Sequence, residues 1–232
     1  MAILGRGLRA SLYRKFLHKF YLNDLWLDLA IAAKRESVEY IRAHMLAAQV
    51  LPDRYALLRF ALAAAPQDGM VLEFGVEKGL SVNCLARATP RLVHGFDSFR
   101  GLPQAWAGTR ESHGAFDRKG RLPKVPANVR LHVGWFDETL PPFLAAEPAP
   151  AALVHIDCDI YASTRVVFDL LGPRIGPGTV IVFDEYFNYP GWQQHEFRAF
   201  QDFIARERRR YEYIGFSAER GHVAVRMLTS PG

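Results

Sequence analysis

Cysteine is scarce in this chain, with only two in 232 residues, Cys84 and Cys158. They do not form a C-x-x-C motif, which excludes a disulfide framework and a zinc site of closely spaced cysteines. One falls in an expected helix and the other beside an expected strand end. We expect both to be reduced thiols in the core of a cytoplasmic protein.

Long hydrophobic runs are missing as well. The sequence contains no run of 18 uncharged apolar residues, which argues against a transmembrane helix. Arg6, Arg9 and Arg14 interrupt the apolar residues near the N-terminus, so we expect no signal peptide. Both absences agree with a cytoplasmic location.

Beyond residue 20 the chain has no excess of either charge. The net charge of +5 equals that of the five basic residues in residues 1–20, which contain no acid: Arg6, Arg9, Arg14, Lys15 and Lys19. The other 24 basic and 24 acidic residues balance. This distribution excludes a uniformly basic nucleic-acid-binding protein.

The basic segment has the periodicity of an amphipathic helix over residues 7–22. Its apolar positions, Leu8, Leu12, Phe16 and Phe20, recur every four residues, with bases on the other faces. One interpretation is an arm that caps the substrate or lies on a membrane surface. The interpretation we favour is a helix packed on its own domain or on a second subunit, and we expect a homo-oligomer.

The order of expected elements predicts an α/β fold without internal repeats. Helices over 24–49, broken near residues 35–37, and over 55–65 come first. Expected strands then lie at 70–74, 92–96, 129–133, 152–156 and 179–183, and expected helices at 80–88, 138–145, 162–171 and 193–207. This alternation is typical of a parallel sheet. The short connection 217–221 makes the last two strands, 211–216 and 222–228, an antiparallel hairpin.

Residues 71–81, Val-Leu-Glu-Phe-Gly-Val-Glu-Lys-Gly-Leu-Ser, predict a buried strand, a glycine turn and the start of a helix. Their spacing is not the dinucleotide fingerprint G-x-G-x-x-G. Gly75 and Gly79 allow the backbone to approach a ligand closely. Glu73 suits the amino group of that ligand, and Ser81, at the helix start, suits its carboxylate.

A second acid strengthens this interpretation. Asp97 ends the next expected strand, 24 residues after Glu73. An acid at that place is positioned to bind a ribose diol. A ligand that has both an amino acid moiety and a ribose points to S-adenosylmethionine (SAM).

The motifs of this chain, taken in order, resemble those of class I SAM-dependent O-methyltransferases, and within that class the macrocin O-methyltransferase family. They are Glu73–Val76, Gly79–Ser81, Gly95–Pro103, Gly134–Phe136, His155–Tyr161 and Phe183–Tyr186, within residues 50–228. The resemblance implies a Rossmann-like, mostly parallel sheet of seven strands with a C-terminal antiparallel hairpin, plus N-terminal helices. It also implies a helical arm or cap over 1–50, a SAM-dependent methyltransferase domain over 51–232, and a cofactor site that includes Ser98 and Trp135.

Four acidic residues follow two of the expected strands. Asp157 and Asp159 come after the fourth strand, and Asp184 and Glu185 after the fifth. At the carboxyl ends of neighbouring strands their mutual repulsion calls for a cation between them. Oxygen ligands suit Mg²⁺ or another divalent cation such as Ca²⁺ better than zinc. The alternatives are capping of the following helix for the first pair and a solvated turn for the second.

The resemblance implies specific roles for these acids. Asp157, Asp184 and Glu185 would ligate the metal ion, and Asp157 would also border the cofactor. Glu185 stands where several relatives have Asp or Asn. Catechol-type relatives carry a lysine where this chain has Ile160, so we expect no lysine-assisted mechanism.

Two further features concern the acceptor. His195 opens an expected helix and is either a general base or a surface residue of the first helical turn. His155, inside a strand, is expected in the core. Residues 98–127 show no period and contain Trp106 and Phe116, so we expect them to form part of the substrate wall.

Methyl transfer from a sulfonium to oxygen requires alignment of donor and acceptor and removal of the hydroxyl proton. A divalent cation acidifies a bound oxygen, and Asp157, Asp159 or His195 would take the proton. We therefore expect a Mg²⁺-dependent O-methyltransferase that acts on a hydroxyl of a small molecule, a sugar or another specialised metabolite. The alternatives are a catechol- or phenol-type enzyme, and a SAM-binding protein docked to a membrane or a partner through its basic N-terminal helix.

Overall fold

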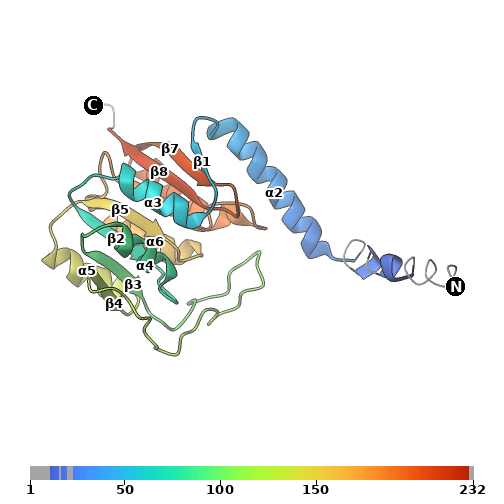
Figure 1. Cartoon of the computed structure of the whole chain (residues 1–232), viewed down its shortest axis with the longest axis horizontal. Helices are drawn as coiled ribbons and strands as arrows, with labels where there is room; N and C mark the ends of the chain where they lie inside the picture. Colours follow the sequence, from blue (N-terminus) through green and yellow to red (C-terminus); the bar gives the residue numbers. More distant parts are fainter. Residues whose placement is uncertain (1–10, 16, 20–22, 230–232) are drawn as a thin grey trace.

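The computed structural model describes residues 11–15, 17–19 and 23–229, which are built around one sheet (Figure 1). The strands are β1 Gln49–Leu51, β2 Met70–Phe74, β3 Val93–Asp97, β4 Val129–Val133, β5 Ala151–Ile156, β6 Val180–Phe183, β7 Arg210–Ser217 and β8 Val223–Leu228. The helices are α2 Leu25–His44, α3 Arg54–Ala64, α4 Leu80–Ala88, α5 Phe136–Ala146, α6 Tyr161–Leu171 and α7 Glu196–Arg206, with short 3₁₀ turns at Gly172–Arg174 and Trp192–Gln194. This is the α/β alternation that the sequence predicts.

The strand order is β1-β7-β8-β6-β5-β2-β3-β4, and β8 alone among these strands runs antiparallel to its neighbours. The expected C-terminal hairpin, β7 with β8, is therefore confirmed. The expected number of seven strands is wrong, because Gln49–Leu51 adds an eighth strand beside β7. Three residues at a sheet edge are too few to show a strand period in the sequence.

Helices cover both faces of the sheet, and each face has its own hydrophobic core. Neighbouring residues of a strand point to opposite faces, so Val71 packs with α3 and α4, whereas Leu72 packs with α5, α6 and α7. Strands β2, β5 and β6 are buried along their whole length. These central strands position the residues that follow them, because their ends have little freedom to move.

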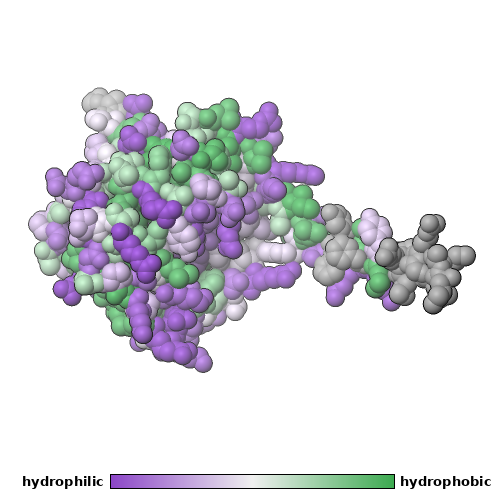
Figure 2. Space-filling view, in the orientation of Figure 1, coloured by the Kyte–Doolittle hydropathy of each residue, from purple (hydrophilic) through white to green (hydrophobic). Residues whose placement is uncertain are grey.

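Helix α2 runs without a break, so the expected interruption near residues 35–37 is wrong. Ser37, a residue that favours helix ends, is accommodated because its hydroxyl donates to the Ala33 carbonyl at 2.7 Å and accepts from the Asn188 N–H at 2.9 Å. Leu25 and Leu29, at the other end, are 75% and 53% exposed. The helix is thus anchored near its C-terminal end, and its outer half projects from the domain with apolar surface (Figures 1 and 2).

Half of the helix expected over residues 7–22 lies outside the described residues, which include 11–15 and 17–19 of it. Residues 11–15 are helical, and Leu12 is exposed there. In the described part of the chain, no helix combines the length and apolar character that a membrane crossing requires.

Candidate active site

The candidate site lies where the sheet changes direction. The chain builds outward from β2 through β3 and β4, then returns to place β5 on the other side of β2. Ligands of open α/β sheets bind in the crevice at such a point, outside the carboxyl ends of the strands. A cavity of about 940 Å³ opens there, and the loops after β2, β3, β5 and β6 line it.

Gly75 keeps the loop after β2 close to the loop after β5. Its φ is +92°, and a Cβ at this position would lie 1.7 Å from the carbonyl oxygen of Asp157. The Asp157 N–H donates to the carbonyl of Phe74 at 2.8 Å. Only glycine allows this contact, which places the Asp157 side chain beside the glycine turn.

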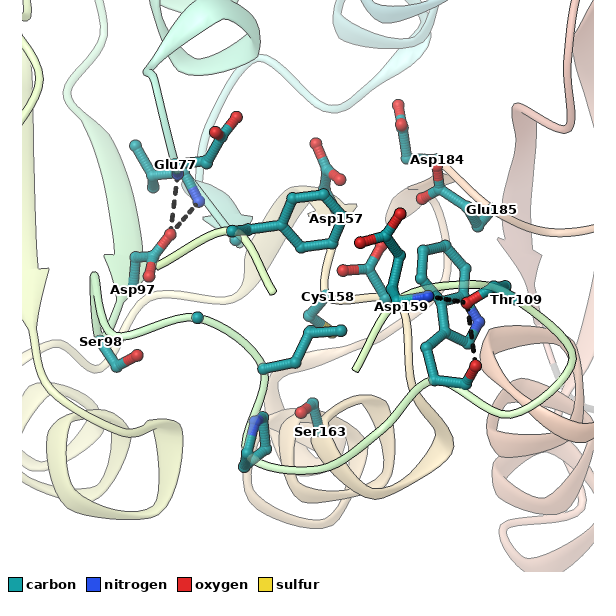
Figure 3. Close-up of a pocket in the computed structure, with 18 of the residues that line it drawn as sticks. Glu77, Asp97, Ser98, Thr109, Asp157, Cys158, Asp159, Ser163, Asp184 and Glu185 are labelled. Atoms are coloured by element: carbon teal, nitrogen blue, oxygen red, sulfur yellow. Dashed lines mark hydrogen bonds between the residues drawn. The ribbon is translucent and has the colours of Figure 1, made fainter. Parts of the chain in front are cut away.

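Asp97 shapes the cofactor end of the cavity. One of its oxygens accepts from the N–H groups of Val76 and Glu77, each at 2.8 Å, and the other accepts from the N–H of Phe99 at 2.6 Å. These bonds hold the turn after β2 against the end of β3. Asp97 and Ser98 lie at one end of the cavity, opposite the acidic residues that follow β5 and β6 (Figure 3).

Most of the residues predicted to bind the cofactor line the cavity, namely Gly75, Ser81, Asp97, Ser98, Trp135 and Asp157. Glu73 and Gly79 are not among the lining residues. Gly79 is the N-cap of α4, with a φ of +78°. Glu73 is fully buried: its carboxylate accepts from the Ser81 hydroxyl at 3.0 Å and lies 3.0 Å from His155 Nδ1.

Groups of alternating charge, buried at the Glu73 end and half-buried at Arg54 and Asp157, lead from Glu73 to the cavity. His155 Nε2 lies 3.8 Å from Asp184, whose other oxygen is 3.3 Å from an Arg54 guanidinium nitrogen. A second nitrogen of Arg54 donates to Asp157 at 3.0 Å. The order of the groups in space is therefore carboxylate, imidazole, carboxylate, guanidinium, carboxylate. Each basic group lies between two acidic groups.

These contacts decide the protonation of His155 and Asp184. Burial alone lowers the pKa of His155, but the Asp184 and Glu73 carboxylates outweigh it and raise the pKa to about 10. Burial alone raises the pKa of Asp184, but His155, Arg54 and His222 outweigh it and lower the pKa to about 2. At neutral pH the first is an imidazolium and the second a carboxylate. His155 is thus a core residue, as expected, and it is charged.

Among the described residues, Asp159 and Glu185 have no basic partner within ion-pair distance, whereas Asp157 has Arg54. Burial, followed by the neighbouring carboxylates, raises the pKa of Asp157, Asp159 and Glu185. Among the described residues, two sets bring their ligand atoms within 4.8 Å of one another: His155 with Asp157 and Asp184, and Asp157 with Asp159 and Glu185. Asp157 thus belongs to both sets, whereas Glu185 is grouped with Asp159 and not with Asp184.

The second set fits a divalent cation. Its three side chains offer carboxylate oxygens, which are the ligands that Mg²⁺ and Ca²⁺ take in proteins. Glu185 Oε2 is buried and has no hydrogen-bond partner among the described residues. A buried, unpaired carboxylate oxygen costs free energy unless a cation compensates it.

Glu196 contacts the backbone of the site, and the sequence interpretation did not assign it there. It is fully buried in the first turn of α7. One carboxylate oxygen accepts from the N–H groups of Cys158 and Asp159, at 3.3 and 3.1 Å, and the other accepts from the N–H of Glu185 at 3.2 Å. Glu196 therefore ties the loop after β5 to the loop after β6. The only sequence signal for it was an acid at a helix start.

His195 is not the surface residue that one interpretation expected, because it is buried. Nor does it line the cavity. Its Nε2 lies 2.8 Å from the Ala107 carbonyl, and its ring lies against Trp106 and Tyr189. Burial lowers the pKa of His195, so the neutral ring donates from Nε2 and anchors the loop that contains Ala107.

The far wall of the cavity consists largely of that loop, residues 98–127, as expected for a substrate wall. Trp106, Arg110 and Phe116 line the cavity from the loop. Trp26 of α2 also lines it, with the Arg110 guanidinium 5.2 Å from its ring centroid. Aromatic faces and cations thus surround the part of the cavity that is not next to the glycine turn.

Comparison with known proteins agrees with this architecture. Residues 72–186 match a family model described as a methyltransferase domain. With the sheet order and the cavity at the β2–β5 crevice, this match supports the Rossmann-like class I methyltransferase fold that the motifs predicted.

A relative from Streptomyces olivaceus shows a more specific similarity. Over 159 residues the chain is 32% identical to 8-demethyl-8-(2,3-dimethoxy-alpha-L-rhamnosyl)-tetracenomycin-C 4'-O-methyltransferase of Streptomyces olivaceus. The alignment covers 56% of this chain and 58% of that enzyme. The chain therefore spans less than two thirds of the relative's length.

Solved structures show the same fold. CalS11, a calicheamicin methyltransferase, matches with a TM-score of 0.59 and 21% identity over 93% of this chain and 90% of its own. The O-methyltransferase NovP matches with a TM-score of 0.54 and 22% identity over 76% of this chain and 80% of its own.

Proposed function

We propose that this protein transfers the methyl group of SAM to a hydroxyl group of a sugar in a specialised metabolite. The observation that carries the proposal is the two-ended cavity at the β2–β5 crevice. Its glycine turn and Asp97 suit an amino acid and a ribose, and a carboxylate cluster lies at the opposite end. The relative from Streptomyces olivaceus is named for methylation of a rhamnosyl group, which supports a sugar acceptor.

The cofactor would lie along the loops after β2, β3 and β4. Gly75 and Ser81 border the amino acid end, Asp97 and Ser98 the ribose, and Trp135 the adenine. Glu73 would act on this site indirectly, because its carboxylate holds the Ser81 hydroxyl. Gly79 would act by setting the backbone at the start of α4.

A divalent cation, with Mg²⁺ as the leading candidate, would be held by the carboxylates after β5 and β6. Sequence resemblance assigns Asp157, Asp184 and Glu185 to it, and the geometry adds Asp159. When bound, such an ion would acidify a hydroxyl oxygen that it contacts. Glu196 keeps the backbone of this cluster in place.

The hydroxyl proton would pass to a carboxylate oxygen of Asp157 or Asp159. Both side chains line the cavity, so either could lie within reach of a bound hydroxyl group. His195, the third expected base, serves instead to position the acceptor wall, because it lies outside the cavity lining and its Nε2 is bonded to Ala107.

The first test is calorimetric titration of S-adenosylhomocysteine (SAH), the product of methyl transfer, on wild type and on Trp135→Ala. Loss of stacking on the adenine should raise the Kd for SAH about tenfold. Val133→Ala, an exposed residue at the end of β4 and two residues before Trp135, is the matched control and should bind normally. Absence of SAH binding by the wild type would refute the proposal.

The second test is an acceptor screen by mass spectrometry. Purified protein, SAM and Mg²⁺ would be incubated with nucleotide sugars, glycosylated polyketides and catechols. A mass increase of one methyl group (about 14 Da) on a sugar supports the proposal. Methylation confined to the catechols would replace it with the phenol-type alternative.

A further inference from the structure

Four basic side chains line the cavity, and two of them have no acidic partner. Arg54 is bonded to acids that follow β5 and β6, and Lys78 Nζ lies 2.7 Å from the Glu77 carboxylate. The other two are Arg110 and Arg220, which are exposed to solvent. Neither of their guanidinium groups forms an ion pair or a hydrogen bond with any residue that the structure describes. Their charges are therefore available to a ligand.

Arg110 lies in a tight turn whose backbone is held in place. The Trp106 N–H donates to the carbonyl of Glu111 at 3.0 Å and closes the turn. A Cβ on Gly108 would lie 2.1 Å from the carbonyl oxygen of Pro190, so only glycine allows the turn to pack this closely on the segment after β6. The position of Arg110 in the cavity wall is thus set by backbone contacts.

The indole ring of Trp26 orients the Arg110 side chain without neutralising it. The guanidinium lies 5.2 Å from the ring centroid, within the limit of about 6 Å for a cation–π interaction. Such a contact leaves the guanidinium without a counter-ion. Glu111, the next residue, also lines the cavity, but it forms no ion pair with Arg110. The fold therefore holds this arginine in an acidic cavity with its charge uncompensated.

Arg220 lies in the turn between β7 and β8, which packs on the same segment after β6. The Asn188 side-chain amide donates to the Arg220 carbonyl at 3.1 Å. Gly221 forms a bridge with Glu185, and a Cβ on this glycine would lie 2.1 Å from the Phe187 carbonyl oxygen. Arg220 has a φ of +59°, which is uncommon for a residue with a long side chain. Backbone conformations of this kind persist where surrounding contacts hold them, and they cluster at ligand sites.

We propose that Arg110 and Arg220 bind an anionic group of the methyl acceptor, a phosphate or a carboxylate. This inference rests on the proposed function, because it concerns the acceptor of the same cavity. Guanidinium groups bind both kinds of anion through paired N–H donors. Because carboxylates are abundant in this cavity, an anion binds there only where dedicated cations compensate it. If the anion is a phosphate linked to the sugar, the enzyme that consumes the methylated product is a glycosyltransferase.

The test is the binding of three sugars to the protein in the presence of SAH and Mg²⁺, measured by calorimetry. UDP-glucose carries a diphosphate, glucuronate carries a carboxylate, and methyl glucoside carries neither. At least one anionic sugar should bind about tenfold more tightly than methyl glucoside. Arg110→Gln and Arg220→Gln should each weaken that binding at least about fivefold. Arg121→Gln, an exposed arginine of the same loop as Arg110 that does not line the cavity, is the control and should bind normally.

Equal binding of the neutral and anionic sugars would overturn the inference, and so would anion binding that is unchanged in either cavity variant. Binding of UDP-glucose alone would assign the anion to a phosphate, and binding of glucuronate alone would assign it to a carboxylate; both support the inference. Circular dichroism checks that the variants are folded, as expected for exposed side chains. A wild type that binds SAH but neither anionic sugar refutes this inference alone, whereas failure to bind SAH refutes the methyltransferase proposal.

Discussion

Arg54 is the cation whose removal should reveal most about this site. It lies in the first turn of α3, after the N-cap Asp53, and bridges Asp157 and Asp184. Arg54→Met keeps an unbranched apolar side chain of similar reach but removes the charge. Both carboxylates then lose a partner in a region that already has an excess of negative charge, so the variant should be less stable.

The size of this loss follows from the exposure of the three side chains. Removing one member of a fully buried ion pair costs about 3–5 kcal/mol. Here Arg54 and Asp157 are 27% and 23% exposed, so water replaces part of the interaction, whereas Asp184 is 6% exposed and keeps His155 as a neighbour. We expect a loss of about 2 kcal/mol in the free energy of unfolding, or about 4–8 °C in Tm for a chain of this size.

The assay is urea denaturation at pH 7.5 with EDTA present, so that no divalent cation substitutes for the guanidinium. Arg59→Met, an exposed arginine of the same helix, is the control and should change stability by less than about 0.5 kcal/mol. The low pKa of Asp184, about 2, means that its ionised form contributes stability above about pH 4 and loses it as the pH falls toward 2. The difference should therefore persist at pH 5. An Arg54→Met loss no larger than the control would refute the reasoning.

Three other changes test separate parts of the structure. Trp26→Ala should raise the KM for the methylated acceptor about two- to fivefold with an unchanged Kd for SAH, because Trp26 lines only the acceptor wall; an unchanged KM would exclude α2 from the acceptor site. Gly75→Ala should cost more than about 4 kcal/mol of stability, measured by urea denaturation, because its Cβ would overlap the Asp157 carbonyl. Burial and His132 lower the pKa of His94 to about 4, so between pH 6.5 and 4 the unfolded chain binds a proton at this residue and the folded chain does not. This difference costs the wild type about 2 kcal/mol of stability as the pH falls through that range. The variant His94→Gln lacks the group, so its stability should fall less over the same range.

The central strands were predictable because each is an apolar run bounded by residues that end it. Strand β2 meets Gly75, β5 meets Asp157 and β6 meets Asp184. The same reasoning predicted which acids share the cavity, since parallel strands bring their carboxyl ends to one edge. The three-residue β1 and the continuous α2 were missed because tertiary contacts decide them. Ser37 favours a helix end in isolation, and it is tolerated in α2 through its bond to Asn188.

The groups that balance the charge of the site could not be predicted from sequence. Arg54 precedes Asp157 by 103 residues, and its use depends on how α3 lies on the sheet. Glu196 looks like an ordinary first-turn acid, which the helix dipole favours on any helix. Its actual partners are N–H groups of two loops. Both contacts require the docking of helices, and local periodicity carries no information about docking.

The uneven distribution of cations within the cluster bears on catalysis. Arg54 and the protonated His155 both lie on the Asp184 side, so neither forms an ion pair with Asp159 or Glu185. A sulfonium loses its positive charge as its methyl group moves to oxygen, and uncompensated carboxylates beside it would stabilise the reactant more than the transition state. Within the fold, Asp184 is paired with Arg54 and lies near His155, whereas the carboxylates of Asp159 and Glu185 have no such partner in the described part of the chain. The cation that we propose at those carboxylates would therefore affect the reaction more than the stability of the folded chain.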